Sequence, residues 1–86
     1  MEVLRGFVYR IIYQNTQNTY CVFLVKDYNE EYITCTGRFE APKEGEDIEI
    51  KGRYVEHQKY GIQFDASSIE KLNGVEWKAR KWNGME

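Results

Sequence analysis

Alternation of apolar and polar side chains along most of this chain is the feature that most constrains its fold. Such a period of two is typical of short strands, because successive side chains of a strand point to opposite faces. Glycine and polar clusters interrupt the pattern, and the resulting runs cover residues 5–13, 19–27, 31–39, 47–56 and 62–70. A chain of 86 residues has room for a single modest core. We therefore expect five strands around one shared interior.

The order of strands and turns favours a closed barrel over an open sheet, since closure leaves no unpaired edges in so short a chain. We predict an all-β, five-stranded OB-fold barrel with Greek-key connections, and an SH3-like barrel is the competing interpretation. Many OB folds carry a helix between the third and fourth strands. Here only EAPKEGED, residues 40–47, is available, and it is too short and acidic for a packed helix. Another segment must therefore close that end of the barrel.

The segment after the fifth strand carries helix signals. Ser67 is followed three positions later by Glu70, and Asn73 and Gly74 come soon after, which together predict a short capped helix. That helix is a candidate to close the barrel end. We assign residues 1–72 to the barrel and residues 73–86 to a C-terminal helix or tail. This tail contains Trp77 and Trp82, which we expect to pack against the barrel or a neighbour.

The two cysteines, Cys21 and Cys35, lie in apolar stretches without a CxxC motif. We expect buried free thiols and neither a disulfide nor a metal site. The N-terminus lacks the charged and long apolar regions of a leader, and no window approaches the length of a membrane span. These features predict a cytoplasmic protein without membrane contact.

Catalytic signals are weak. The chain lacks the GxxxxGK[ST] motif with which ATPases hold phosphates. Its one histidine, His57, lies next to Glu56, and neighbouring strand residues point to opposite faces, so the two do not form an acid and base pair. The carboxylates of the stretch before the fourth strand are typical of a solvated edge. We predict a protein that is not an enzyme and needs no cofactor.

Alternation also predicts which side chains face the core. In the run 19–27, Tyr20, Val22 and Leu24 share one face and are expected inside. Phe23 is then expected to point outward as a stacking residue, although a bulge in the first strand would spoil such counting. In the run 47–56, the same argument places Ile48, Ile50, Gly52 and Tyr54 inside, and Lys51 and Arg53 outside.

In an OB fold, the loop at residues 14–18 and the turn at residues 57–61 flank the face that commonly binds nucleic acid or sugar. Tyr60 would be placed to stack on a base and Lys59 to meet a phosphate. His57 is more simply explained as an exposed turn residue. The predicted nucleic-acid-binding residues are Arg10, Asn15, Asn18, Phe23, Lys26, Arg38, Lys51, Arg53, His57, Lys59 and Tyr60. An oligosaccharide or small-molecule ligand ranks lower.

A formal net charge of −2 opposes a nucleic-acid role, but the charges are unevenly distributed. Residues 1–26 and residues 51–64 each carry three basic side chains against one acidic side chain. Residues 27–50 carry eight acidic side chains against two basic ones, and residues 65–86 balance. The basic segments are those that an OB face presents, so we expect weak, salt-sensitive binding of single-stranded DNA on one side.

Three stretches of the chain resemble a known family in order and spacing: GFVYRIIYQNTQNTYCVFLVK, TCTGRF and EGEDIEIKGRYVEHQKYGIQFDASSIE. They are similar to the N-terminal OB domain of RecD-like ATP-dependent DNA helicases, the long subtype with an extension ahead of the motor. The resemblance covers roughly residues 5–72. It implies a non-catalytic module that handles DNA in repair or recombination. A docking domain for the helicase motor or another repair protein is the alternative.

Overall fold

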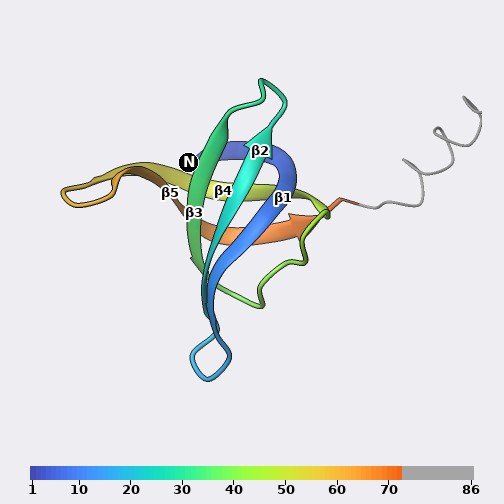
Figure 1. The fold of residues 1–86 in the computed structure, drawn as a ribbon, viewed down its shortest axis with the longest axis vertical. Coiled ribbons are helices and arrows are strands. Elements are labelled where there is room, and N and C mark those ends of the chain that lie inside the picture. The colour runs from blue at the N-terminus through green and yellow to red at the C-terminus, as the bar shows by residue number, and fades with distance from the viewer. Residues whose placement is uncertain (73–86) are drawn as a thin grey trace, which may run out of the picture.

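The computed structural model describes residues 1–72, which form five strands and no helix (Figure 1). The bounds are β1 Glu2–Asn15, β2 Tyr20–Asp27, β3 Tyr32–Arg38, β4 Asp47–His57 and β5 Gly61–Lys71. The predicted strands are therefore confirmed, and the first and the fifth are longer than expected. Within this part of the chain, no helix is long and apolar enough to cross a membrane.

The strands close into a barrel in the order β1-β2-β3-β5-β4, with β4 returning to pair with β1. All neighbouring pairs are antiparallel except β3 and β5, which run parallel over Cys35–Gly37 and Phe64–Ala66. Two hairpins, β1–β2 and β4–β5, extend beyond the barrel (Figure 1). This arrangement confirms the all-β, five-stranded closed barrel, consistent with an OB fold.

The barrel interior is filled by apolar side chains from every strand. Ile48 and Ile50 of β4 are fully buried, as their alternation predicted, and Gly52 is buried beside them. The buried apolar residues are Leu4, Val8, Cys21, Phe23, Val25, Cys35, Ile48, Ile50, Phe64 and Ala66. Both cysteines are free thiols in this core, and burial raises the pKa of Cys35 well above its ordinary value.

The prediction of which β2 side chains face the core is wrong. Phe23 is fully buried, with an exposed fraction of 0%, whereas Tyr20, Val22 and Leu24 point away from the core. The register explains the reversal, because Phe23 pairs with the buried Cys35 of β3 and with Ile11 of β1. Both faces of this strand carry apolar side chains, so alternation alone does not distinguish them. Phe23 therefore belongs to the core and cannot stack on a ligand.

The predicted helix at Ser67 is also wrong over the described residues, because β5 continues as a strand to Lys71. Ile69 pairs with Ile50 of β4 and packs against the core. The Ser67 hydroxyl donates a hydrogen bond to the carbonyl of Lys51 at 3.1 Å, where the two strands shift register. Packing of the partly buried Ile69 against the core, together with strand pairing, therefore overrides the local helix signals. The remainder of that helix and the tail at 73–86 lie outside the described residues.

Tyr54 lies at the rim of the barrel and is not buried as predicted. Its ring meets the buried Phe64 edge to face, with centroids 4.9 Å apart, but 41% of the residue is exposed. The β4–β5 hairpin leaves the barrel here, so among residues 1–72 the outer edge of the ring is left uncovered. Desolvation, followed by the nearby carboxylate of Glu2, raises the pKa of Tyr54.

Phe39 closes the end of the barrel where many OB folds place a helix. It follows β3 directly, and its ring covers Gly37 so closely that a Cβ there would lie 2.3 Å from the ring. The ring also lies 6.2 Å from that of Phe23, and Ala41 packs against the same core. Residues 39–46, which we call the connector, are then held to β1 by two backbone hydrogen bonds between Val8 and residues 45 and 46. A few apolar side chains thus replace the helix.

Gly52 permits the close approach of β4 and β5. A Cβ at this position would lie 2.1 Å from the carbonyl oxygen of Asp65 and 2.8 Å from the Cα of Ala66, both in the backbone of β5. Gly52→Ala is therefore expected to lower the free energy of unfolding by about 1 to 3 kcal/mol, as overpacking does elsewhere. Urea denaturation measures the change, with the exposed Ser68→Ala as the control. Equal urea midpoints for Gly52→Ala and Ser68→Ala would contradict this expectation, because β4 and β5 would then accommodate the added methyl group without loss of stability.

Candidate nucleic-acid interface

A groove lies between the β1–β2 hairpin and the β4–β5 hairpin, across the outward faces of β2 and β3. It has a volume of about 510 Å³. Its lining, which we call the tyrosine groove, consists of Ile12, Tyr13, Tyr20, Val22, Thr34, Thr36, His57, Tyr60 and Gln63. Segments far apart in the sequence therefore meet on one side of the barrel.

One wall of the tyrosine groove is formed by Tyr13 and Tyr20. Their ring centroids are 6.2 Å apart with an interplanar angle of 54°, and Tyr13 is 49% exposed. Two register shifts in β1, after Val8 and after Ile11, turn Tyr13 to the same outward side as Val22 of β2. The first strand therefore contains two irregularities of the kind that invalidates a prediction of inward and outward side chains from alternation. They give this face exposed aromatic rings that simple alternation does not predict.

The opposite wall is formed by the tip of the β4–β5 hairpin. Tyr60 is 62% exposed, and its ring lies 4.9 Å from that of His57 and 5.5 Å from the Lys59 ammonium. His57 Nδ1 accepts a hydrogen bond from the backbone N–H of Lys59 at 3.2 Å, which shapes the turn. Gly61 ends the turn with a φ of +79°, a conformation that glycine adopts without strain. The local sequence thus presents Tyr60 and Lys59 to solvent at the edge of the groove.

Basic side chains lie over other tyrosine rings of this face. The Arg38 guanidinium is 5.3 Å from the centroid of Tyr20, and Lys26 Nζ is 5.7 Å from that of Tyr32. Arg10 lies 6.0 Å from the ring of the neighbouring Tyr9. Such cation–aromatic contacts hold the charged group near a ring face. The three predicted basic residues Arg10, Lys26 and Arg38 therefore share the outward side of β1, β2 and β3.

Arg53 and Lys51 lie further around the barrel. Arg53 pairs with Asp65 of β5, whose carboxylate accepts a hydrogen bond from the Thr36 hydroxyl at 3.5 Å. Because Thr36 lines the tyrosine groove, Arg53 borders the same face. Lys51 points outward as predicted, but it pairs with Ser68 and with Val3 of β1, outside the groove lining. Neither side chain lines the tyrosine groove, and Arg53 is linked to it through Asp65 and Thr36.

Asn15 and Asn18 shape the β1–β2 turn. The side-chain oxygen of Asn15 accepts the backbone N–H of Gln17 at 2.9 Å, and that of Asn18 accepts the backbone N–H of Tyr20 at 3.0 Å. The side-chain amide of Asn15 also donates to the Tyr13 hydroxyl at 3.3 Å. These contacts position the tyrosine ring and the turn, so both asparagines act on the groove through its shape.

The tyrosines that dominate this face, which are Tyr9, Tyr13, Tyr20 and Tyr32, were not among the predicted binding residues. One signal could have identified some of them. Tyr13 and Tyr20 flank the polar turn at residues 14–18, which is visible in the sequence. Tyr9 and Tyr32 are brought together by the fold, where their rings meet edge to face with centroids 4.9 Å apart. Aromatic residues on both sides of a hairpin turn are expected to lie side by side when the turn is symmetric.

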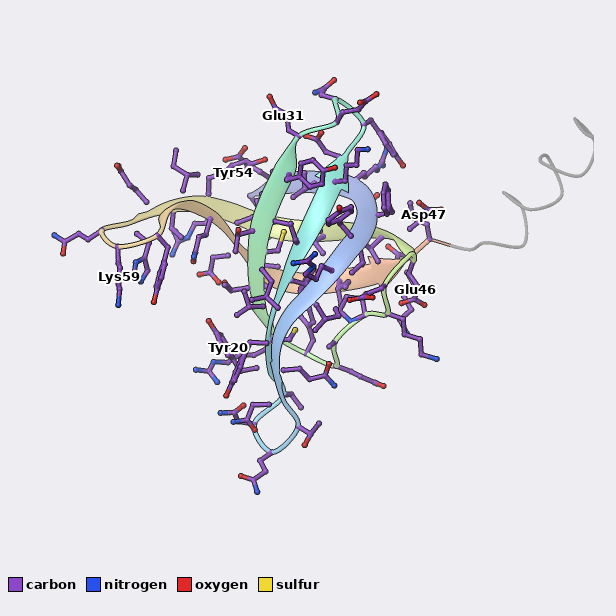
Figure 2. The ribbon with its side chains drawn as sticks, viewed as in Figure 1. Tyr20, Glu31, Glu46, Asp47, Tyr54 and Lys59 are labelled. Atoms are coloured by element: carbon purple, nitrogen blue, oxygen red, sulfur yellow. The ribbon has the colours of Figure 1, made fainter. Side chains whose placement is uncertain are left out.

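Acidic side chains collect on a different part of the molecule. Figure 2 shows Glu46 and Asp47 on the side of the barrel opposite Lys59. Glu44 accepts the backbone N–H of Ile11 at 3.1 Å, and Glu46 accepts that of Lys43 at 2.7 Å. These carboxylates hold the connector in place. The tyrosine groove therefore lies away from many of the acidic side chains that give the chain its negative net charge.

Comparison with known families agrees with this fold. A family model described as "ATP-dependent DNA helicase YrrC, OB-fold domain" matches residues 1–73. The match spans all five strands, both hairpins and the connector. The chain therefore belongs to the family of OB-fold domains of the ATP-dependent DNA helicase YrrC.

Proposed function

We propose that the tyrosine groove binds single-stranded DNA, in a helicase that acts in DNA repair or recombination. The observation that carries this proposal is the exposure of Tyr13 and Tyr60 on opposite walls of one groove, with Arg38 over the ring of Tyr20 and Lys59 over the ring of Tyr60. Unpaired bases stack on exposed aromatic rings whatever their identity, and nearby cations meet the phosphates. Paired bases do not offer their faces in this way, so single strands fit the groove better than duplexes.

The charges predict the strength of binding. Arg38 and Lys59 lie over tyrosine rings of the groove, and Arg53 is paired with Asp65, whose carboxylate contacts Thr36 of the groove lining. About three phosphate contacts give weak affinity with a marked salt dependence. For a single strand, about three contacts correspond to a slope of log affinity against log salt of about −2. Affinity is then expected to fall about 20-fold between about 50 mM and about 200 mM salt.

Fluorescence anisotropy of a labelled oligothymidylate at these salt concentrations tests the proposal. Arg38→Ala removes one contact, so its slope should be shallower than that of the unmodified chain by about 0.7. Arg5→Ala is the matched control, because the Arg5 side chain pairs with Glu49 at 2.7 Å, away from the groove. Equal slopes for the two variants would contradict the proposal.

Docking onto the helicase motor or another repair protein is the second candidate function. The observation in its favour is an apolar surface outside the tyrosine groove, formed by Tyr54 and Ile62, which are 41% and 67% exposed. Both point to the side of the β4–β5 hairpin that faces away from the groove lining. A failure of the chain to bind single strands at low salt would favour this docking function.

A further inference from the structure

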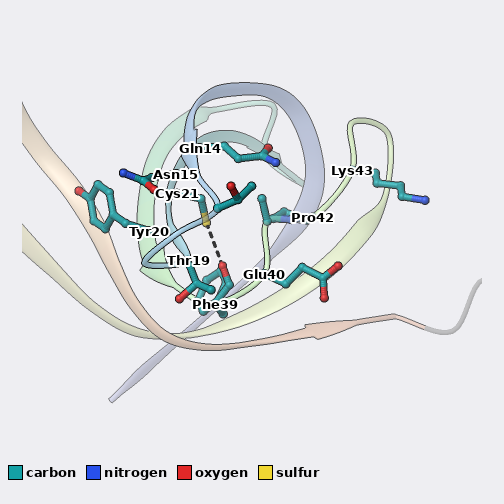
Figure 3. A pocket seen from close by; sticks show the side chains of 11 residues that line it. Gln14, Asn15, Thr19, Tyr20, Cys21, Phe39, Glu40, Pro42 and Lys43 are labelled. Carbon is teal, nitrogen blue, oxygen red and sulfur yellow. Dashed lines mark hydrogen bonds between the residues drawn. The ribbon is translucent and has the colours of Figure 1, made fainter.

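A second groove lies at the barrel end that Phe39 closes, between the β1–β2 hairpin and the connector (Figure 3). It holds about 460 Å³ and is separate from the tyrosine groove, with which it shares Tyr20. Phe39, Ala41 and Pro42 form one wall, and the buried Cys21 contacts Phe39 within the lining. The Cys21 thiol donates a weak hydrogen bond to the Phe39 carbonyl at 3.6 Å. We call this site the connector groove.

One wall of the connector groove is apolar, and its rim carries the carboxylate of Glu40 and the ammonium of Lys43. Phe39 and Ala41 are only partly buried although they pack against the core, so a further side chain can cover them. Glu40 lies on the rim and is exposed, and no ion pair among residues 1–72 engages it. Glu44 and Glu46 lie outside the groove lining, and Glu46 pairs with Lys71 at 3.8 Å, so Glu40 is the carboxylate that an occupant would meet. An occupant with aromatic and basic side chains would complement both properties.

Residues 73–86 of the same chain have this composition. The stretch 77–82 is WKARKW, in which Trp77 and Trp82 flank three basic side chains without an acidic one. The described chain also ends beside the connector, because the backbone N–H of Leu72 donates to the carbonyl of Asp47 at 2.9 Å. The segment therefore begins next to the surface that it would cover.

The lengths of chain are compatible with such a contact. Phe39 is eight residues from Asp47, so the two are separated by at most about 28 Å. Trp82 is ten residues beyond Leu72 and can reach about 33 Å from it when the chain is extended. Trp77, five residues beyond Leu72, can reach about 17 Å, enough for the part of the connector near Lys43. Both indoles are thus within reach of the groove on the same molecule.

We propose that residues 73–86 bind the connector groove of their own chain, with a tryptophan ring against Phe39 and Ala41 and the basic side chains near Glu40. The segment would then lie over the apolar side chains that already close this barrel end, Phe39 and Ala41. The proposal of this contact does not rest on DNA binding, although the two grooves share Tyr20. Burial of an indole there adds apolar contact area at the barrel end.

Tryptophan fluorescence of the full chain tests this proposal directly, because Trp77 and Trp82 are the two tryptophans of the sequence. A peptide of residues 73–86 gives the emission of water-exposed indoles. The full chain is expected to emit at shorter wavelength than the peptide and to be quenched less by acrylamide. Single Trp77→Phe and Trp82→Phe variants show which ring produces the shift.

Two substitutions in the groove should remove the effect. Ala41→Glu places a charge on the apolar wall, and Glu40→Lys reverses the charge of the exposed rim without touching the core. Both are expected to move the emission toward that of the peptide. Ile62→Glu, at an exposed position on the distant β4–β5 hairpin, should leave the emission unchanged. Glu40→Lys carries the test if Ala41→Glu fails to fold.

Three results would overturn the proposal. The first is an emission spectrum of the full chain equal to that of the peptide. The second is a blue shift that Glu40→Lys leaves intact in a folded protein at low salt. The third is a blue shift that disappears on dilution, since that would show contact between two copies. A concentration-independent shift that is sensitive to the groove substitutions supports the intramolecular contact.

Discussion

Phe23→Ala is expected to lower the free energy of unfolding by about 3 to 5 kcal/mol, the usual cost of removing a buried aromatic ring. The ring is fully buried at the centre of the barrel, where β2 pairs with both β1 and β3. It also supports Phe39, which closes the barrel end at a centroid distance of 6.2 Å. Removal therefore leaves a cavity and loosens that closure. Urea denaturation followed by circular dichroism measures the change.

Phe23→Leu separates this role from a role in DNA binding. Leucine keeps much of the apolar volume, so the variant should fold and bind single strands with unchanged affinity. If Phe23 were a stacking residue, loss of the ring would weaken binding in a protein that still folds. A stable Phe23→Leu variant with reduced affinity would therefore contradict the burial of this ring.

The double variant Tyr20→Ala with Tyr60→Ala is expected to bind single-stranded DNA about 30-fold or more weakly. Each base that stacks on an aromatic side chain contributes about 1 to 3 kcal/mol, and the two rings lie on opposite walls of the tyrosine groove. Arg38 and Lys59 also lose the rings that hold them in place, which adds to the effect. Anisotropy titration at low salt gives the ratio of dissociation constants.

Two controls make this result specific. Tyr20→Phe with Tyr60→Phe retains both rings and should retain binding, since stacking does not need the hydroxyl groups. Tyr28→Ala removes a tyrosine that is 69% exposed in the β2–β3 turn, outside the tyrosine groove, and should bind like the unmodified chain. Equal losses in Tyr28→Ala and in the groove variant would show that exposed rings act without regard to position.

Local patterns in the sequence were sufficient to predict the strands and their closure into a barrel. Ile48 and Ile50 alternate with charged residues, so one face of β4 is clearly apolar and its burial follows. The turn before Gly61 is likewise a local feature, because a positive φ favours glycine there and the preceding residues form the tip of the hairpin. Features that depend on neighbouring residues along the chain were therefore predictable.

The orientation of β2 was not predictable in this way. Tyr20, Val22 and Leu24 are as apolar as Cys21, Phe23 and Val25, so both faces suit a core. The decision came from the partners, because the register shifts in β1 and the pairing of Phe23 with Cys35 determine which face turns inward. The tyrosine groove depends on the same decision, since it exposes Tyr13 and Tyr20 on one side.

By itself, the sequence determined five strands, a closed barrel and a hairpin tip that carries Lys59 and Tyr60, because period-two alternation and turn chemistry act over a few residues. Tertiary structure alone decided that Phe23 is core, that Ser67 lies in a strand and that the tyrosines of two hairpins share one groove. These outcomes depend on register between strands distant in sequence. A shift of one residue in register exchanges the buried and exposed faces of a strand.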